Sequence, residues 1–514
     1  MNIVILHCHF ERGGVTQVVE NHVRWLQDDQ QINQIVLVSG HRVAGLSERT
    51  CQAVTQIVVD DFDYDPLIQA GSSETRSESI VATLQAKLSG LGIDASNAVL
   101  HWHNHSLGKN TAAPRAIHRL ASNGWRLLLQ IHDFAEDYRP MNLQRLVEAS
   151  AASTKQDLDR YLYPTATQIR YATLTGADAT ALIRLGVPET AVHCLPNSVV
   201  PLESGIDRAD ALSKVCEAMD LPADASWCLY PVRGIRRKNV GEFLLLCRWL
   251  PAGMFGGITL RPTTEVESLS YQRWRSVAVE VSPNAVFDAA HHPEVSFAEN
   301  LAAAEFAIST SVAEGFGMAF LEPWLMKREV IARRLPTVTD DFESSGVKLP
   351  KLYDQISIPG DSSWVNQCAQ EEQDAFNEAW SDVAPEFRPR MDRDFEEQAE
   401  SVDFARLTPV RQIGVLRRFQ QDRGFERDAQ AVSASLVKNL STAENEEIVS
   451  ENSERISAEY SPEQTGRKLI RIYAALANST CDQELSSVEH AGAAVDLIAS
   501  ARPFYPCRTE KLNV

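Results

Sequence analysis

One short, mostly apolar stretch of the chain combines the residue types that polar ligand sites use. Residues 309–324 read STSVAEGFGMAFLEPW and contain these candidates: Glu314, Gly315, Phe316, Gly317 and Glu322. Glycines let a ligand approach the backbone closely, and amides at the start of a helix favour an anion or a hydroxyl-rich ligand. Carboxylates are strong acceptors for paired sugar hydroxyls. Taken alone, the motif fits an ordinary strand–loop–helix turn equally well.

A second stretch places positive charge after a buried apolar run. In PVRGIRRKN, which follows WCLY, the cations are Arg233, Arg236, Arg237 and Lys238. Arginine offers a planar fork to phosphate oxygens, and lysine offers a mobile point charge. The loop therefore predicts a local anion site. A solvated basic loop is the alternative for a charge run considered by itself.

Histidines gather after two neighbouring apolar runs. HWHNHSLGKN contains His101, His103 and His105, which alternate on a predicted strand so that all three can face one side. No H-E-x-x-H and no matching carboxylate pair accompany them, so no metal site is predicted. The next run ends in QIHD, with His132 and Asp133. We interpret His103, His105 and Asp133 as weak candidates for substrate binding, and His101 as a satisfied core histidine.

The first strand–helix turn carries a glycine pair, Gly13-Gly14, within HFERGGVTQ. It is not the dinucleotide fingerprint, because G-x-G-x-x-G is missing, and it is not a P-loop, because no G-K-[ST] follows. The pair alone is weak evidence for a phosphate site.

Composition limits the classes of partner. The chain has 514 residues, 44% hydrophobic and 23% charged, with a net charge of -20. This charge argues against nucleic acid or an anionic membrane as the main partner. Nine scattered cysteines without a C-x-x-C pair favour a reducing compartment, and no apolar run approaches the ~18 residues that span a bilayer. We expect a cytoplasmic protein, and peripheral membrane contact is not favoured.

Alternating apolar and helical patterns predict an α/β fold with two doubly wound, Rossmann-like domains facing a central cleft. The first series of strands closes at Pro196-Asn197-Ser198, which marks a hinge. The second runs through WCLYPVRG, GITLRP, SVAVEVS and EFAISTS. The predicted domains are 1–198, 199–460 (with a helix-rich elaboration at 343–460) and 461–514 (a helix and tail).

In this order, the motifs resemble the retaining GT-B glycosyltransferases, specifically glycosyltransferase family 4. That family carries a glycine pair, a His-Asp, a Pro-Asn at the domain junction, an Arg-x4-Lys and an E-x7-E. Here the matching positions are Gly13-Gly14, His132-Asp133, Pro196-Asn197, Arg233, Lys238, Glu314 and Glu322. The match covers residues 1 to about 342 and the helix from Ser461, while 343–460 has no counterpart.

The resemblance implies a role for each matching position in binding a nucleotide-sugar donor. Glu322 would hold the ribose, and Glu314 would hold hydroxyls of the donor sugar together with the amides of Gly315, Phe316 and Gly317. Arg233 and Lys238 would neutralise the diphosphate, His132 would lie near the reacting centre, and Gly13, Gly14 and Asn197 would complete the donor site. The catalytic candidates are His132, Arg233, Lys238 and Glu314.

The implied reaction moves a hexose from a UDP- or GDP-sugar to a hydroxyl acceptor, with retention and front-face attack. Neither a protein nucleophile nor a metal is required, and no further cofactor is expected. The acceptor would be a small molecule or a glycan. The resemblance makes 1–198 the acceptor domain, with His103, His105 and Asp133 as weak candidates for acceptor binding. It makes 199–460 the donor domain and the helix from Ser461 a segment that crosses back to the first domain. After Glu322 the sequence departs from the family, and Pro323 shifts or kinks the following helix. Two alternatives stay open: a GT-B-like binding protein without catalysis, and a glycoside hydrolase using Glu314 and Glu322.

Overall fold

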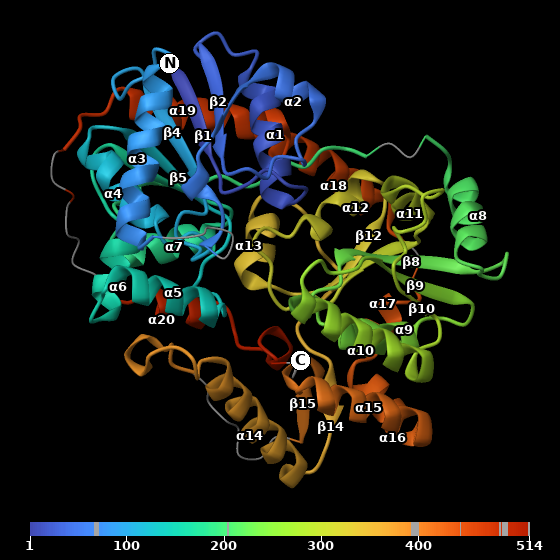
Figure 1. Ribbon diagram of the computed structural model, residues 1–514. Helices are drawn as coiled ribbons and strands as arrows, with labels where there is room; N and C mark the ends of the chain where they lie inside the picture. The colour runs from blue at the N-terminus through green and yellow to red at the C-terminus, as the bar shows by residue number, and fades with distance from the viewer. Residues whose placement is uncertain are drawn as a thin grey trace. The chain divides into compact units, whose positions relative to one another are not determined.

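The computed structural model describes residues 1–65, 71–202, 205–391, 400–442, 444–482, 485 and 492–511 (Figure 1). The chain divides into two compact units, each built from three separate segments. The first unit comprises 1–198, 380–390 and 460–502, and the second comprises 199–379, 391–459 and 503–514.

The first unit is built on a seven-stranded parallel sheet with the order β3-β2-β1-β4-β5-β6-β7. Its strands are β1 (Asn2–Leu6), β2 (Gln34–Ser39), β3 (Thr55–Val58), β4 (Ala98–His103), β5 (Arg126–Ile131), β6 (Ile169–Thr173) and β7 (Val192–Cys194). The central strands β1 and β4 are buried along their whole length. Strands covered on both faces read as continuous apolar runs, which is why NIVIL and AVLHWH were predictable.

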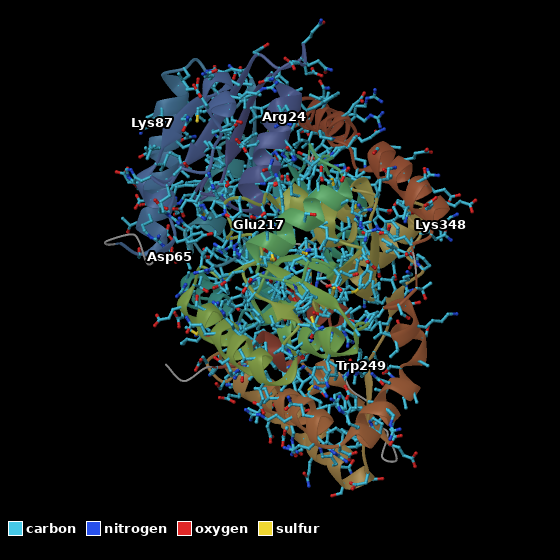
Figure 2. All side chains as sticks on the ribbon, turned by 90° about the vertical axis from the view of Figure 1, so that its right-hand side faces the viewer. Arg24, Asp65, Lys87, Glu217, Trp249 and Lys348 are labelled. Atoms are coloured by element: carbon cyan, nitrogen blue, oxygen red, sulfur yellow. The ribbon has the colours of Figure 1, made fainter. Side chains whose placement is uncertain are left out.

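Helices cover both faces of this sheet, as the crossover connections between parallel strands require. They are α1 (Gly14–Leu26), α2 (Glu48–Ala53), α3 (Ser73–Ser89), α4 (Ala113–Ser122), α5 (Pro140–Ser150), α6 (Lys155–Leu162), α7 (Gly176–Leu185), α19 (Pro462–Ala477) and α20 (Ala494–Ala501). Helix α19 packs its apolar face on the β1–β4 region through Leu469, Tyr473 and Leu476, which are fully buried. The polar side chains of Arg24 and Lys87 are exposed on the outside of α1 and α3 (Figure 2).

The second unit is built on a six-stranded parallel sheet with the order β10-β9-β8-β11-β12-β13. Its strands are β8 (Ser226–Arg233), β9 (Met254–Leu260), β10 (Ala285–Val286), β11 (Phe306–Ser309), β12 (Glu329–Arg333) and β13 (Leu352–Tyr353). Its helices are α8 (Arg208–Ala218), α9 (Val240–Trp249), α10 (Glu265–Val281), α11 (Phe297–Ala303), α12 (Glu322–Leu325) and α13 (Pro336–Ser344).

The elaboration expected at 343–460 is rich in helices, as predicted. It contains α14 (Ser362–Ala379), α15 (Pro409–Gln421), α16 (Arg423–Val432), α17 (Ala434–Asn439) and α18 (Glu446–Glu459), with the antiparallel pair β14 (Ser357–Pro359) and β15 (Ser401–Asp403). A buried ion pair joins this segment to the sheet, because Arg333 at the end of β12 binds Asp403 of β15 and Glu242 of α9, at 2.8 and 2.7 Å.

Two local predictions in the second unit were wrong. The stretch SVAVEVS, expected as a strand, ends helix α10, and the strand of that region is the two-residue β10. Its alternating valines mimic a strand, yet Val279 is 78% exposed on the outer face of the helix. The parallel sheet also extends to β13, inside the range that we had assigned to the elaboration. Two-residue strands are too short to produce a readable pattern.

No helix among the residues that the structure describes combines the length and apolar character needed to cross a membrane.

Candidate functional site

The basic loop and the first glutamate of the E-x7-E motif meet because their strands are neighbours. Strands β8 and β11 pair in parallel, so the loops that follow them leave the same edge of the sheet. Lys238 lies in a 3-10 turn after β8, and Glu314 lies in the loop after β11. The Nζ of Lys238 donates to Oε1 of Glu314. The same oxygen accepts a hydrogen bond of 2.6 Å from Oγ of Ser311.

This ion pair is buried. The side chains of Lys238 and Glu314 are 10% and 7% exposed. Burial alone would raise the pKa of Glu314, but the positive charges of Lys238 and Arg237 outweigh it and hold this pKa below its usual value. Glu314 is therefore an ionised acceptor at neutral pH, and Lys238 is a cation that is already desolvated.

A network of hydroxyls holds the backbone of this turn. The carbonyl of Lys238 accepts hydrogen bonds from the hydroxyls of Tyr230 and Thr310, at 3.0 and 2.9 Å. The Tyr230 hydroxyl also lies 2.7 Å from Oγ of Ser311, the residue that donates to Glu314. Sequence reasoning missed these three residues. The Ser-Thr-Ser run before Glu314 is a visible signal, but Tyr230 reads only as part of a buried strand.

The glycine loop after Glu314 has a steric reason for one of its glycines. Gly317 has φ +90°, and a Cβ at this position would lie 2.8 Å from Cγ1 of Val338. The side chain of Phe316 is buried edge-on against Phe342, with ring centroids 5.5 Å apart. The amides of Gly315 and Gly317 make no hydrogen bond to any residue that the structure describes. These amides are thus available to a ligand.

Glu322 begins the four-residue helix α12, and Pro323 occupies the second position of that helix. The helix therefore starts separately from the preceding 3-10 turn, Met318–Phe320, in agreement with the shift expected from the proline. The carboxylate of Glu322 has no hydrogen-bond or ion-pair partner within the described part of the chain, and burial raises its pKa to about 7.

Arg233 and Lys238 have different surroundings. Arg233 ends β8, and its Nη1 donates to the carbonyl of Arg261 at 2.8 Å. Among the described residues, no hydrogen bond or ion pair joins Arg233 to Lys238 or Glu314. Arg236 pairs with Glu267 and is thereby occupied within the fold. The cations that lower the pKa of Glu314 are Lys238 and Arg237.

In the first unit, the predicted residues lie at the ends of the adjacent strands β1, β4 and β5. Gly13 is extended and precedes α1, which begins at Gly14. A Cβ at Gly14 would meet no atom within 4 Å, and one at Gly13 would meet only the Glu11 carbonyl at 3.9 Å. Neighbouring atoms of the described fold therefore do not require a glycine at either position. A side chain, or a ligand, would find open space beside this turn.

His132 and Asp133 follow β5 and are anchored from the end of β4. Oδ1 of Asn104 accepts from the amide of His132 at 2.8 Å and from the amide of Asp133 at 3.3 Å. Asp133 forms an ion pair of 2.6 Å with Arg139. Burial lowers the pKa of His132 to about 4, although the charge of Asp133 acts in the opposite direction. The imidazole is therefore neutral at physiological pH.

The alternating histidines do not share one environment. His101 and His103 are fully buried, and His105 is 1% exposed. The two nitrogens of His101 meet the Tyr473 hydroxyl at 2.7 Å and Oε1 of Gln130 at 2.9 Å, which confirms it as a satisfied core histidine. His105 is separate, with Nε2 2.9 Å from the carbonyl of Leu162. Acceptor binding by His103, His105 and Asp133 stays a prediction. Because both histidines are buried, an acceptor could contact them directly only if their side chains became exposed.

The nitrogens of His22, His101 and His103 lie within 4.8 Å of one another, close enough to raise the question of a metal. The rings of His101 and His103 stack with centroids 4.3 Å apart and planes 28° apart. A metal ion must lie in the plane of each imidazole that binds it, and two stacked rings do not share such a point. This arrangement fits a packed histidine cluster better than a metal centre.

Asn197 follows β7 in the Pro-Asn pair, and its Oδ1 is buried without a hydrogen-bond partner within the described part of the chain. The Pro196 carbonyl accepts a long hydrogen bond of 3.5 Å from Thr465 of α19.

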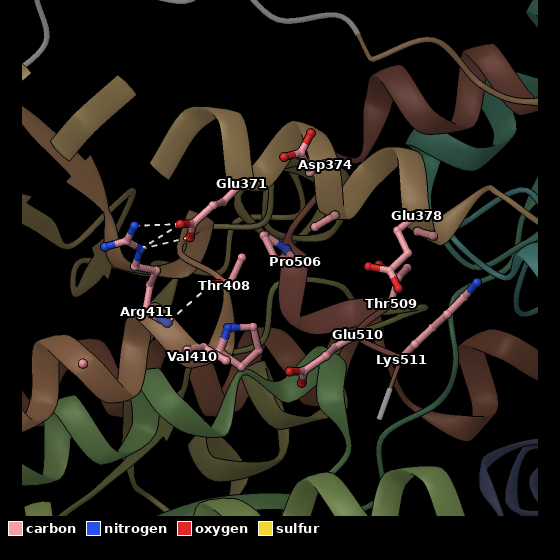
Figure 3. A pocket seen from close by; sticks show the side chains of 14 residues that line it. Glu371, Asp374, Glu378, Thr408, Val410, Arg411, Pro506, Thr509, Glu510 and Lys511 are labelled. Atoms are coloured by element: carbon pink, nitrogen blue, oxygen red, sulfur yellow. Dashed lines mark hydrogen bonds and ion pairs between the residues drawn. The ribbon is translucent and has the colours of Figure 1, made fainter. Parts of the chain in front are cut away.

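A cavity of about 720 Å³ lies in the second unit, lined by α14, the start of α15 and the C-terminal turn (Figure 3). None of the predicted site residues lines it. Its wall is acidic, but Glu371 pairs with Arg411 and Glu510 pairs with Arg273. The charges of these two glutamates are therefore neutralised within the fold.

Comparison with known proteins tests the fold. No family model matches the chain. Mannosylglucosyl-3-phosphoglycerate synthase of Petrotoga mobilis is 26% identical over 389 residues, which are 73% of each of the two chains. A sucrose-phosphate synthase from Thermosynechococcus elongatus aligns over 93% of this chain and 99% of its own, with a TM-score of 0.53 and 12% identity. A glycosyltransferase from Rickettsia africae gives the same coverage, with a TM-score of 0.54 and 11% identity.

The chain has the GT-B fold. Anabaena HepE in complex with UDP also aligns, over 92% of this chain and all of its own, with a TM-score of 0.51 and 12% identity. The sequence match to the Petrotoga synthase supports a glycosyltransferase. At such identities, the structural likenesses carry the fold, and the site must be argued from its own geometry.

Proposed function

We propose that the chain is a retaining glycosyltransferase of the family 4 type, which moves a hexose from a UDP- or GDP-sugar to a hydroxyl of a small acceptor. The observation that carries this proposal is the buried Lys238–Glu314 pair at the ends of β8 and β11. It combines a desolvated cation with an ionised acceptor beside the free amides of a glycine loop, which suits a ligand that is both anionic and rich in hydroxyls.

Lys238 is proposed to stabilise the leaving diphosphate. Breaking the sugar–diphosphate bond leaves more negative charge on the diphosphate than the ground state carries. A fixed cation aimed at that charge therefore favours the transition state. Arg233, at the end of the same strand, would join it once its side chain releases the Arg261 carbonyl. Since these cations supply the charge, we propose that a divalent metal is not essential.

The glutamates and glycines are proposed to hold the rest of the donor. Glu314, oriented by Ser311 and Lys238, would accept hydrogen bonds from sugar hydroxyls. The amides of Gly315, Phe316 and Gly317 would donate to sugar or phosphate oxygens, as backbone amides do at anion sites. Glu322 has no described partner, and the two ribose hydroxyls would supply one.

The first unit is proposed to contribute His132, the glycine turn and Asn197 to donor binding. The neutral ring of His132 would contact the sugar near the reacting carbon. The open space above Gly13 and Gly14 would admit the diphosphate close to the backbone. The buried, unpartnered oxygen of Asn197 is an acceptor that a donor hydroxyl could meet.

Retention by front-face attack needs no protein nucleophile, and the contacts of Glu314 are consistent with that. Its Oε1 accepts from Lys238 and Ser311, which suits a carboxylate held in place to accept from sugar hydroxyls. The basic loop beside Glu314 has no use in the chemistry of a glycoside hydrolase that uses Glu314 and Glu322. Turnover of aryl glycosides without any nucleotide would favour that alternative.

The acceptor is proposed to be a small anionic molecule, and phosphorylated glycerate glucosides are the first to test, because the Petrotoga relative is named for such a compound. Two cations of the first unit, Lys109 and Arg145, have no carboxylate partner among the described residues. Burial, Arg145 and Arg139 lower the pKa of Lys109. Like charges held together without counter-charge are suited to an anionic ligand. The double variant K109M/R145M should raise KM for a phosphorylated acceptor far more than for its dephosphorylated form.

The deciding experiment is calorimetric titration with UDP, GDP and ADP, with and without Mg²⁺, followed by transfer assays with the matching nucleotide sugars. We expect one nucleotide to bind without metal, and K238M to weaken binding and abolish transfer. K214M is the matched control, because Lys214 is a surface lysine of α8 paired with Glu299. No binding of any nucleotide would refute the proposal. Binding without transfer to any acceptor would favour the catalytically inactive alternative.

A further inference from the structure

Two neighbouring residues at the end of β4 contact His132. Asn104 accepts hydrogen bonds from the backbone amides of His132 and Asp133. His103, the residue before it, has Nδ1 2.8 Å from Nε2 of His132, and their rings stack with centroids 5.1 Å apart. Backbone and ring of His132 are thus both fixed by the dipeptide His103-Asn104. Asn104 adopts φ +56°, which turns the chain so that both side chains face β5.

A hydrogen bond between two neutral imidazoles leaves two choices for the proton. Either Nδ1–H of His103 donates to Nε2 of His132, or the direction is reversed. Reversal would place the proton of His103 on its Nε2. That atom is completely buried and has no partner in the described part of the chain. A buried N–H without an acceptor costs more free energy than a buried lone pair without a donor, so His103 should carry its proton on Nδ1.

The surroundings of His103 keep it neutral. Burial and the rings of His101, His132, His22 and His7 lower its pKa well below the usual value. Nδ1 of His7 lies 3.4 Å from the carbonyl of His103, which can only accept. No carboxylate pairs with the His103 ring among the described residues. A doubly protonated His103, which could donate in both directions, is therefore excluded at neutral pH.

The other ring nitrogen of His132 faces a different environment. Nδ1 of His132 has no hydrogen-bond partner among the described residues, and this atom is not fully buried. The residue keeps 7% of its surface exposed. Because Nε2 accepts from His103, the proton of the neutral ring must lie on Nδ1, which is the nitrogen that remains accessible.

We propose that His103 is a positioning residue that locks His132 as the Nδ1–H tautomer, so that His132 presents a hydrogen-bond donor to a hydroxyl or ring oxygen of the bound sugar. The contact between His132 and the sugar rests on the proposed function, whereas the tautomer of His132 does not. Metal-binding histidines are fixed in the same way, by a hydrogen bond at the ring nitrogen that does not bind the metal. Here the partner is another imidazole, and the oriented group is a donor.

The test measures the tautomer and the activity separately. Protein labelled with ¹⁵N in histidine is examined by long-range ¹H–¹⁵N correlation, which distinguishes protonated from bare ring nitrogens, and H132N assigns the His132 signals. The variants are H103L, which removes the donor, and H103N, whose amide can donate from nearly the position of Nδ1. H22L is the control, because it removes another ring of the cluster that makes no hydrogen bond to His132. Thermal unfolding checks that each variant folds.

We expect the wild-type His132 to carry its proton on Nδ1, with or without donor. H103L should give mixed tautomers and lower kcat/KM about three- to tenfold, the scale of one neutral hydrogen bond. H103N should restore both readouts, and H22L should change neither. A wild-type His132 protonated on Nε2, or an unchanged tautomer in H103L, would overturn the inference. If the tautomer behaves as expected while H132N keeps full transfer activity, the inference stands and the proposed role of His132 fails.

Discussion

If Glu322 holds the ribose as proposed, we predict that donor binding depends on pH near neutrality. Its carboxyl has a pKa of about 7 in the free protein because burial disfavours the ionised form. Ribose hydroxyls donate to a carboxylate, so the ionised form should bind the donor. A carboxyl with this pKa is roughly one tenth ionised at pH 6 and nine tenths ionised at pH 8. Affinity for the nucleotide sugar should therefore rise about tenfold between these two values.

The assay is calorimetric titration with a nucleotide sugar between pH 6 and 8. A nucleotide sugar is preferable to a free nucleotide, whose terminal phosphate itself titrates near pH 6. E322Q should bind independently of pH, and at pH 8 it should bind about 10- to 100-fold more weakly, because a charge-assisted hydrogen bond is lost. E343Q, at a surface residue of α13 paired with Arg334, should retain the wild-type slope. An equal slope in E322Q, or weaker wild-type binding at higher pH, would refute the reasoning.

The same pKa predicts the sign of a stability effect. The folded-state pKa of Glu322 lies above the usual 4.5, so the unfolded chain releases this proton more readily than the folded chain. The contribution of Glu322 to the free energy of unfolding therefore decreases as pH rises from about 4.5 to 7. E322Q should remove this loss, so the difference in Tm between E322Q and wild type should grow in favour of E322Q over that range.

Further outcomes follow from the geometry. K238M should lose about 3 kcal/mol of unfolding free energy by leaving Glu314 buried and unpaired, and K238M/E314Q should regain most of it in urea titrations without regaining transfer. G317A should lower stability by about 1–3 kcal/mol, because it forces a side chain into the left-handed region, whereas G14A should leave Tm unchanged and weaken donor binding. R333M should cost about 3–5 kcal/mol, measured the same way, since Arg333 neutralises two buried carboxylates.

Sequence patterns were sufficient for strands whose residues are uniformly apolar. They failed for β12, because EVIAR begins and ends with charge although all five residues are buried. Its charges are compensated by partners distant in sequence, such as Lys351 for Glu329 at 2.7 Å. Such pairing leaves no periodic signal near the strand, so a charged buried strand cannot be distinguished from a loop.

The candidate site was predictable to the extent that it follows strand ends. Arg233, Lys238, Glu314 and Glu322 each lie at the end of a strand or in the loop or short helix that follows one, which was enough to place them at a common edge of the sheet. What the sequence could not show is which side chains touch. The contact of Lys238 with Glu314, but not of Arg233, depends on the order of β9, β8 and β11.

The interrupted first unit has a consequence for how the protein is made. Its sheet is complete at residue 198, yet the helix that covers β1 and β4 begins at Pro462, and His101 bonds to Tyr473, 372 positions later. A ribosome adding 5–20 residues per second needs on the order of tens of seconds to cover that gap. During this interval the nascent sheet exposes an apolar face and a histidine that lacks one of its two hydrogen-bond partners. The first unit is thus the first to be translated and among the last to be completed, and its folding depends on whatever shields that face until α19 emerges.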